Sequence, residues 1–273
     1  MKPTAFDFVR AGSLTEASRL LVESKGAARL IAGAQSLGPM LNLRLVRPRI
    51  LIDITGIPEL TRIEDTNETV TVGACVTTAN IEDKRLPGRG LEALASIAAN
   101  IAYRAVRNRG TVGGSLCHAD PAADWPSALS ALGAQCLIFG TSGKREMPAD
   151  AFITGAFATA LAPGEMLEAI RIPRLSARGR CGFYKVCRKA GEFASAIGAV
   201  VSDRDRGQFR VVIGAGKSQP IVFKDAEDLQ DDDGRIDETM LLKLLEKVGI
   251  ADRIERRQKA SAVVRAYAQT VIR

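Results

Sequence analysis

The chain has 273 residues, of which 46% are hydrophobic and 25% charged, and it carries a formal net charge of +7. This composition is ordinary for a globular protein that buries a core, and the length allows roughly two domains. No apolar run approaches the ~18–20 residues that cross a bilayer, and the N-terminus lacks the apolar segment of a signal peptide, so a cytoplasmic location is expected.

The cysteine and histidine content excludes several kinds of site. Five cysteines are scattered along the chain without a Cys-x-x-Cys pair. This pattern argues against a disulfide scaffold and against an iron–sulfur or zinc site within the chain, so no metal site is expected. A single histidine, His118, excludes a histidine-rich metal centre. The basic residues fall in short clusters without interleaved aromatic residues, so nucleic-acid binding is not expected either.

The first 54 residues predict a compact unit of helices and mostly parallel strands. Residues 13–16 (SLTE) form a capping-box pattern before a helix that Gly26 ends. A short strand at 28–32 leads into a loop, a short helix at about 39–45 follows, and a strand spans 49–54.

The rest of the chain mixes strands and helices and ends in two helices. In order, we expect a strand at 69–74, a helix at about 90–99, a helix capped by Asp120, a strand at 134–139, a turn at 140–143, a strand at 166–172, strands at 182–188, 194–202 and 209–215, and helices at about 237–248 and 259–271. Pro173 marks the expected domain boundary.

Two small-residue loops carry the strongest functional signal. Residues 107–124 (RNRGTVGGSLCHADPAAD) place Gly113 and Gly114 between hydroxyl residues, so bare amide groups can form a concave anion site. Asp120 and the proline after it predict an N-cap and a helix start, where the helix dipole also favours an anion. Residues 30–37 (LIAGAQSL) supply the second loop. Taken alone, the first stretch is equally compatible with a tight turn, but the two loops together predict a clamp for a dinucleotide pyrophosphate.

Other motifs in the chain lack residues that their functions require. Residues 214–218 (GAGKS) resemble the end of a P-loop, but Val211 stands where that motif needs glycine, so a turn after a strand is favoured. Neither Gly-x-Gly-x-x-Gly nor Gly-x-Ser-x-Gly occurs, which leaves a Rossmann-type nicotinamide site and a serine hydrolase without support. The acidic run at 231–233 lacks the ligand spacing of an EF-hand and predicts an exposed turn.

The two loops resemble those of a known family. Its first loop usually reads Ala-Gly-Gly-(polar)-Ser-Leu, and its second reads Thr-(Ile/Val)-Gly-Gly-(Ser/Asn), often followed by His-Ala-Asp-Pro. On these motifs the chain resembles the FAD-binding subunit of the molybdenum hydroxylases, the family of xanthine dehydrogenase, carbon monoxide dehydrogenase and bacterial N-heterocycle dehydrogenases. The resemblance includes residues 3–8, 39–44 and 105–110 and covers essentially the whole chain.

The resemblance implies an α+β fold. A PCMH-type FAD-binding domain would span residues 1–172, with subdomains at about 1–54 and 55–172, and a C-terminal α+β domain would span 173–273. FAD would be the cofactor of this chain, with [2Fe–2S] clusters and a molybdenum-pterin cofactor in partner subunits. The chain would be the middle subunit in a dimer of heterotrimers, accepting electrons from the clusters and passing them to an external acceptor. No catalytic acid–base pair is expected, because the flavin carries the redox chemistry.

The resemblance also implies which residues contact FAD. Backbone amides and hydroxyls of the two loops would hold the pyrophosphate, and Asp124 would bind a hydroxyl group of the cofactor. Residues 188–193 (RKAGEF) resemble the family's Arg-Lys-(x)-Gly-Asp-Tyr segment, which places Lys189 and Phe193 beside the isoalloxazine, although core packing is an alternative for Phe193. The full expected set is Ala32, Gly33, Ala34, Gln35, Ser36, Leu37, Thr111, Gly113, Gly114, Ser115, His118, Asp120, Asp124, Lys189 and Phe193.

One position in the first loop departs from the family pattern. Ala34 replaces the usual second glycine. An alanine is tolerated if its φ is negative, but a positive φ costs stability because the Cβ crowds the backbone.

Two other functions remain compatible with the sequence. A stand-alone FAD reductase of the UDP-acetylenolpyruvylglucosamine reductase type would need a catalytic acid and a sugar-nucleotide site, for which no convincing motif is present. A flavin-free nucleotide-binding or scaffold module is the second alternative. The glycines of both loops argue against it, whereas Ala34 leaves it open.

Overall fold

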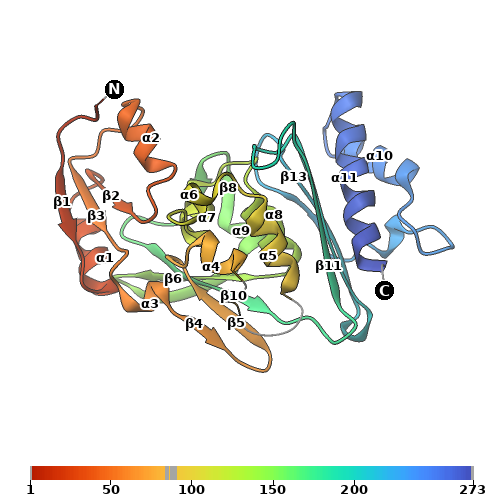
Figure 1. Cartoon of the computed structure of the whole chain (residues 1–273), viewed down its shortest axis with the longest axis horizontal. Coiled ribbons are helices and arrows are strands. Elements are labelled where there is room, and N and C mark those ends of the chain that lie inside the picture. Colours follow the sequence, from red (N-terminus) through yellow and green to blue (C-terminus); the bar gives the residue numbers. More distant parts are fainter. Residues whose placement is uncertain (1, 84–85, 87–90, 272–273) are drawn as a thin grey trace.

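A computed structural model describes residues 2–83, 86 and 91–271, and it arranges them as three units in a row (Figure 1). We call these the N-terminal unit (residues 2–54), the central unit (residues 55–173) and the C-terminal unit (residues 174–271). The chain begins on one outer unit and ends on the other.

A small parallel sheet forms the N-terminal unit. Its order is β1-β3-β2, with β1 at Asp7–Arg10, β2 at Ala28–Ile31 and β3 at Ile50–Asp53. Helix α1 (Leu14–Glu23) begins where predicted. Ser13 Oγ accepts a hydrogen bond from the Glu16 amide, and the Glu16 carboxylate accepts one from the Gly12 amide. Helix α2 (Leu37–Asn42) follows the first loop, and the predicted parallel pairing is confirmed.

A five-stranded antiparallel sheet organises the central unit. Its order is β4-β5-β10-β6-β7, with β4 at Ile63–Asp65, β5 at Thr69–Gly73, β6 at Gln135–Gly140, β7 at Gly143–Pro148 and β10 at Met166–Pro173. The helices are α3 Pro58–Thr61, α4 Thr78–Glu82, α5 Glu92–Ala99, α6 Arg104–Arg107, α7 Val112–His118, α8 Asp124–Ala131 and α9 Ala149–Phe152, and β8 (Ile153–Gly155) pairs with β9 (Ala158–Thr159). Every residue of α8 is buried, because this helix lies between the central unit and the sheet of the C-terminal unit.

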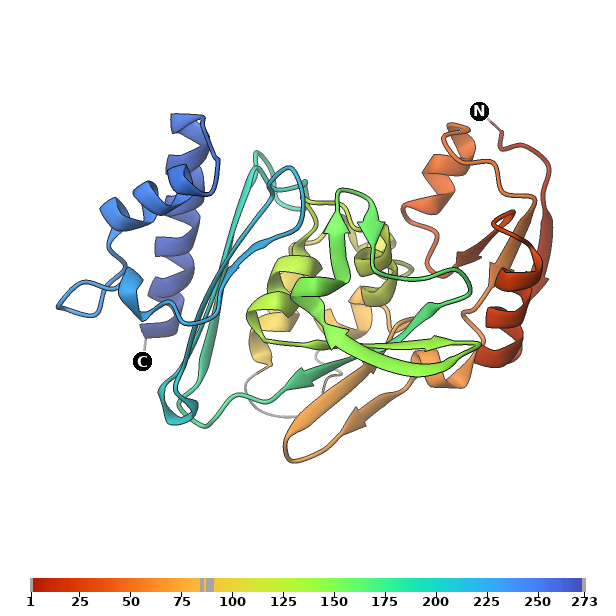
Figure 2. The ribbon, with the colours of Figure 1, turned by 180° about the vertical axis from the view of Figure 1, so that it is seen from behind.

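The C-terminal unit is an antiparallel sheet with two helices on its outer face (Figure 2). Its order is β11-β12-β13-β14, with β11 at Arg180–Val186, β12 at Ala196–Asp203, β13 at Gln208–Gly214, β14 at Ile221–Phe223, α10 at Glu238–Lys247, α11 at Arg253–Val271, and short 3-10 turns at Arg204–Arg206 and Glu227–Leu229. Helix α11 approaches the sheet closely at Gly198, where a Cβ would lie 2.4 Å from the backbone carbonyl of Ala262. Only glycine permits this approach.

Buried apolar side chains of the described residues form two clusters. The larger one joins all three units, from Ile52 in the N-terminal sheet through Trp125 in α8 to Val201 and Val212 in the C-terminal sheet. The smaller one lies between the C-terminal sheet and helices α10 and α11. The main core therefore continues across Pro173.

The predicted strands of the central and C-terminal units are present within one or two residues at most of their ends. Alternating apolar side chains indicate β5, whereas β10 and β12 are nearly continuous buried apolar runs. Strand β7 was not predicted, because Lys144, Arg145 and Glu146 face solvent and leave no apolar alternation to detect. The helix predicted at about 90–99 begins at Glu92, and Gly90 lies outside the described residues. Helix α11 begins at Arg253, earlier than predicted.

The prediction that Asp120 caps a helix is wrong. Helix α8 begins at Asp124, and its N-cap is Ala123. Asp120 instead closes a turn, in which its Oδ1 accepts a hydrogen bond of 2.9 Å from the Ala122 amide. Side chains of this type favour both arrangements, and nothing local distinguishes them. Among the residues that the structure describes, no helix has the length and apolar character that a membrane crossing requires.

Candidate cofactor site

The first loop presents a run of free backbone donors. Within the described part of the chain, the amides of residues 33–37 have no hydrogen-bond partner. The Gln35 side chain folds back and donates to the Gly33 carbonyl at 2.9 Å. Ser36 is the N-cap of α2 but its hydroxyl makes no capping bond. Successive unpaired amides and a free hydroxyl form a site suited to an anion.

Ala34 has a φ of +59°, the left-handed conformation that disfavours any side chain. The sequence identified this position as the departure from the family's second glycine. The structure shows that the alanine is strained there. The left-handed conformation costs about 1–2 kcal/mol at a residue with a Cβ.

The two predicted loops lie side by side. A Cβ on Gly33 would stand 1.9 Å from the carbonyl oxygen of Arg109, and the Gln35 side chain lies next to Gly110. The Gly110 carbonyl in turn accepts a hydrogen bond from the Thr78 amide. Residues of the first loop therefore contact Arg109 and Gly110 at the start of the second, as the predicted clamp requires.

The second loop is a helix rather than an open loop. Thr111 caps α7, and its Oγ1 accepts a hydrogen bond of 3.0 Å from the Gly114 amide. The Gly113 amide donates to Ala74 and the Ser115 amide to the Thr111 carbonyl. The expectation that these three amides bind phosphate is therefore not supported. Gly113 is instead required because a Cβ there would lie 2.4 Å from the Cβ of Ala74.

Asp124 is buried at the start of α8, only 5% exposed. Burial raises the pKa of its carboxyl to about 6, while the Lys185 ammonium on β11 acts in the opposite direction. Lys185 Nζ lies 3.0 Å from Oδ1 but makes its hydrogen bond to Oδ2, at 3.2 Å. Oδ1 is left buried without a hydrogen-bond partner. A buried carboxylate oxygen in this state fits a missing hydroxyl donor.

His118 ends α7 and contacts the ring of Phe157, an aromatic residue that the sequence analysis does not single out. The ring centroids of His118 and Phe157 are 5.2 Å apart with the planes tilted by 52°. Phe157 is 63% exposed and has a φ of +57°, and its amide donates to the Ala119 carbonyl. His118 is half-buried and contacts an exposed ring, so it does not fill the core.

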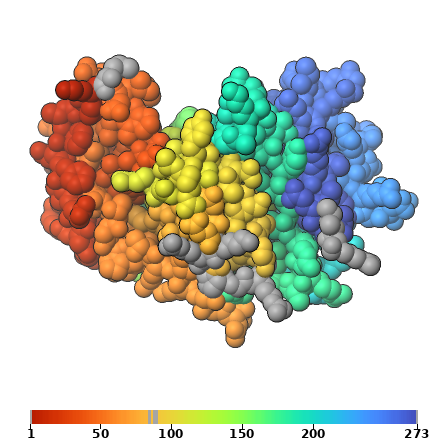
Figure 3. All heavy atoms as spheres, in the orientation of Figure 1, coloured from red at the N-terminus to blue at the C-terminus, as the bar shows by residue number. Residues whose placement is uncertain are grey.

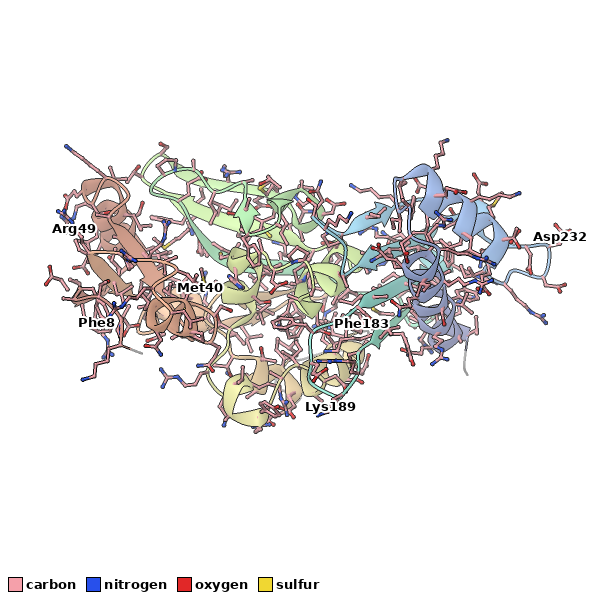
Figure 4. All side chains as sticks on the ribbon, turned by 90° about the horizontal axis from the view of Figure 1, so that it is seen from above. Phe8, Met40, Arg49, Phe183, Lys189 and Asp232 are labelled. Atoms are coloured by element: carbon pink, nitrogen blue, oxygen red, sulfur yellow. The ribbon has the colours of Figure 1, made fainter. Side chains whose placement is uncertain are left out.

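The loop between β11 and β12 carries Lys189 and Phe193, and both are exposed. Phe193 is 68% exposed, so the alternative that it packs in the core is wrong. Gly191 pairs with the segment before α6, where its carbonyl accepts a hydrogen bond from the Ala102 amide at 3.1 Å. Figure 3 shows these two segments rising next to each other, and Figure 4 labels Lys189 on the loop and Met40 on α2.

A buried arginine, Arg107, organises the segment between these loops. Its Nε and Nη2 donate to the two oxygens of Glu82 at 2.7 and 2.8 Å, and its Nη1 donates to the carbonyls of Ile101 and Ala102. Ala102 has a φ of +45°. Sequence reasoning noticed the basic run but missed this role, because Glu82 lies 25 positions away. Lys185 was missed for the same reason.

The described residues contain no group of three or more His, Cys, Asp or Glu side chains that could hold a metal ion. Residues 4–175 match the family described as the FAD binding domain in molybdopterin dehydrogenase.

The relatives of the chain include named subunits of dehydrogenases. It is 35% identical to the 6-hydroxypseudooxynicotine dehydrogenase complex subunit alpha of Paenarthrobacter nicotinovorans over 84% of this chain and 79% of that one. It is 37% identical to the carbon monoxide dehydrogenase medium chain of Hydrogenophaga pseudoflava over 74% and 70%. The solved carbon monoxide dehydrogenase of Hydrogenophaga pseudoflava superposes with a TM-score of 0.87 and 30% identity, covering 99% of this chain and 98% of that one.

Proposed function

Because the chain belongs to the FAD-binding subunits of the molybdenum hydroxylase family, we propose that it carries electrons between the clusters of a partner subunit and an external acceptor. The chain is an oxidoreductase subunit, and FAD is its cofactor. FAD supplies the redox chemistry when bound, and the residues of this chain supply binding, orientation and exclusion of water.

The observation that carries the proposal is the run of five unpaired amides at residues 33–37, held against Arg109 and Gly110. These amides, with the hydroxyls of Ser36 and Thr111, would hold a pyrophosphate, whose negative charge they match. The buried Oδ1 of Asp124 would accept a hydrogen bond from a cofactor hydroxyl. The amides and Asp124 Oδ1 have no hydrogen-bond partner within the described chain, although Oδ1 lies in an ion pair with Lys185, and both fit parts of FAD.

We assign the remaining predicted residues to the surroundings of the cofactor. Ala32, Ala34 and Leu37 would shape the first loop. Gly113 would let α7 pack closely against Ala74, and Gly114 would lie beside the Thr111 hydroxyl. Ser115, His118 and Asp120 would line the face between the loops. Exposed Lys189 would place positive charge beside the isoalloxazine, and Phe193 would cover one face of the ring.

The partners are part of the proposal. The relatives' names include "medium chain" and "complex subunit alpha", which supports a place in a multi-subunit enzyme. We propose a [2Fe–2S] subunit and a molybdenum-pterin subunit as partners, in a dimer of heterotrimers located in the cytoplasm. We further propose a FAD-binding domain at residues 1–172 and a C-terminal domain at residues 173–273.

An absorption spectrum of the protein purified from its own host, with analysis of released cofactor and co-purifying chains, tests this function. We expect an oxidised-flavin spectrum, one FAD per chain, and partners containing iron–sulfur and molybdenum. Flavin without partners would favour a stand-alone flavoenzyme, and a colourless protein that takes up no FAD would favour a scaffold module.

A pair of glycine variants locates the cofactor. Gly33→Ala places a Cβ 1.9 Å from the Arg109 carbonyl, which must push the two loops apart and so release FAD. Gly56→Ala is the matched control, because the nearest atom to its Cβ is 3.8 Å away. FAD content equal in the two variants would contradict the placement of the pyrophosphate.

A further inference from the structure

A buried lysine lies far along the chain from the proposed cofactor residues. Lys259, on α11, is 1% exposed. Its Nζ donates to the carbonyls of Gly214 at 3.0 Å and Ala215 at 2.8 Å, and it lies 3.6 Å from Glu255 Oε1. Burial lowers the pKa of this ammonium, and Glu255 opposes the effect. Burying a charge costs free energy, which the two hydrogen bonds and the nearby Glu255 carboxylate offset.

The carbonyls that Lys259 holds belong to the turn after β13, which reaches across to the central unit. The Ala215 amide donates to the Pro121 carbonyl at 3.1 Å. Ala215 has a φ of +56°, so the turn holds a conformation that alanine disfavours. At the residue before it, a Cβ on Gly214 would stand 2.0 Å from Ser127 Oγ of α8. The turn therefore packs closely against α8, and its two carbonyls accept hydrogen bonds from the Lys259 ammonium.

Pro121 lies in the turn that sets the position of Asp124. Asp120 Oδ1 accepts from the Ala122 amide within that turn, and Asp124 begins α8 immediately afterwards. Lys185 then holds Asp124 from β11. The C-terminal unit therefore contacts the segment 120–124 at both ends, through Ala215 at one and Lys185 at the other.

We infer that Lys259 is a positioning residue for the flavin site, acting through the Ala215–Pro121 hydrogen bond on the turn that carries Asp124. The inference rests on the proposed function, because it assumes that Asp124 contacts FAD. Lys259 touches no part of the cofactor. Without its ammonium the strained turn relaxes, the hold on Pro121 is lost, and Asp124 no longer meets the cofactor in a single orientation.

FAD titration of the full chain, in its complex and alone, tests the inference. Lys259→Met keeps the length of the side chain and removes the three donors. We expect FAD to bind roughly tenfold more weakly, because only about a tenth of the molecules would then hold residues 120–124 in the binding conformation. Lys259→Arg restores a charged donor and should recover part of the affinity. Lys243→Met on neighbouring α10 is the control, because Lys243 is exposed, and its affinity should stay within twofold.

Hydrogen exchange of the wild-type protein keeps the inference testable if Lys259→Met fails to fold. FAD should slow exchange of the Ala215 amide as well as of residues 33–37. Protection confined to residues 33–37, or an unchanged FAD affinity in folded Lys259→Met, would overturn the role of Lys259 but not the proposed function. A wild-type protein that takes up no FAD would overturn the proposed function together with it.

Discussion

At the scale of single residues, the left-handed backbone conformation of Ala34 affects the stability of the first loop. Its φ of +59° costs about 1–2 kcal/mol, whereas a glycine there would lose more chain entropy on folding, by about 0.5–1 kcal/mol. We therefore predict that Ala34→Gly stabilises the protein by roughly 0.5–1 kcal/mol. Urea unfolding measures this change. Ala32→Gly in the same loop is the control, because Ala32 is not among the residues with positive φ and should lose stability instead.

The raised pKa of Asp124 predicts that this residue makes the protein less stable as the pH rises, the opposite of what most carboxylates do. Its folded-state pKa is raised to about 6, above an unfolded value near ~3.9. The folded state therefore binds the proton more readily, so the penalty for burying the charge is complete above pH 6 and fades as the pH falls toward 4.

We expect Asp124→Asn to remove this dependence. The free energy of unfolding of the variant minus that of the wild type should rise between about pH 4 and pH 7 by on the order of 2–3 kcal/mol, and then level off. Urea unfolding of both proteins across this range measures it. A difference that does not change with pH would show that Asp124 is not held in the buried, weakly hydrogen-bonded state described above.

At the scale of elements, the pairing of α4 with α6 sets the shape of the site. Arg107 holds Glu82 with two hydrogen bonds and the strained Ala102 with a third, and the Ala102 amide reaches Gly191 on the loop of Lys189. Lysine has the charge but not the planar fork of donors. We predict that Arg107→Lys costs about 2–3 kcal/mol in the free energy of unfolding and weakens FAD binding.

The neighbouring Arg104→Lys is the matched comparison for this prediction. Arg104 also binds acidic residues of the α4 end, but its side chain is 47% exposed, against 10% for Arg107. Exposed ion pairs contribute about 0–1 kcal/mol. Equal losses in the two variants, measured by chemical unfolding, would mean that the carbonyl contacts of Arg107 contribute nothing.

The same elements explain how much the sequence could predict. The capping box at Ser13 and the apolar alternation of β5 are local patterns, and both appear where expected. Gly113 stands out in the sequence as part of a phosphate loop, whereas in the fold it allows close packing against Ala74, a contact that the local sequence does not indicate. Lys185 and Arg107 could not be assigned, because a buried ion pair depends on a partner that the fold brings from far along the chain.

At the scale of the whole molecule, the three units share one apolar core, and this core extends to both sides of residue 173. The larger apolar cluster includes Val201 and Val212 of the C-terminal sheet. The buried hydroxyl of Ser18 donates to the Gly164 carbonyl at 2.7 Å, which ties α1 to the central unit. Shared core and shared hydrogen bonds make unfolding cooperative, so the units should not melt one by one.

This arrangement predicts how FAD changes thermal unfolding. The proposed contacts come from the N-terminal loop, the central unit and the loop between β11 and β12, so a bound cofactor stabilises all three units together. At about 100 times its Kd, FAD should add about 2.7 kcal/mol, which for a chain of this size raises Tm by roughly 5–10 °C. Calorimetry and far-ultraviolet circular dichroism should report one coincident transition with and without FAD. If the protein melts in two steps and FAD moves only one of them, the cofactor is held by a single unit, and the C-terminal unit has no part in the site.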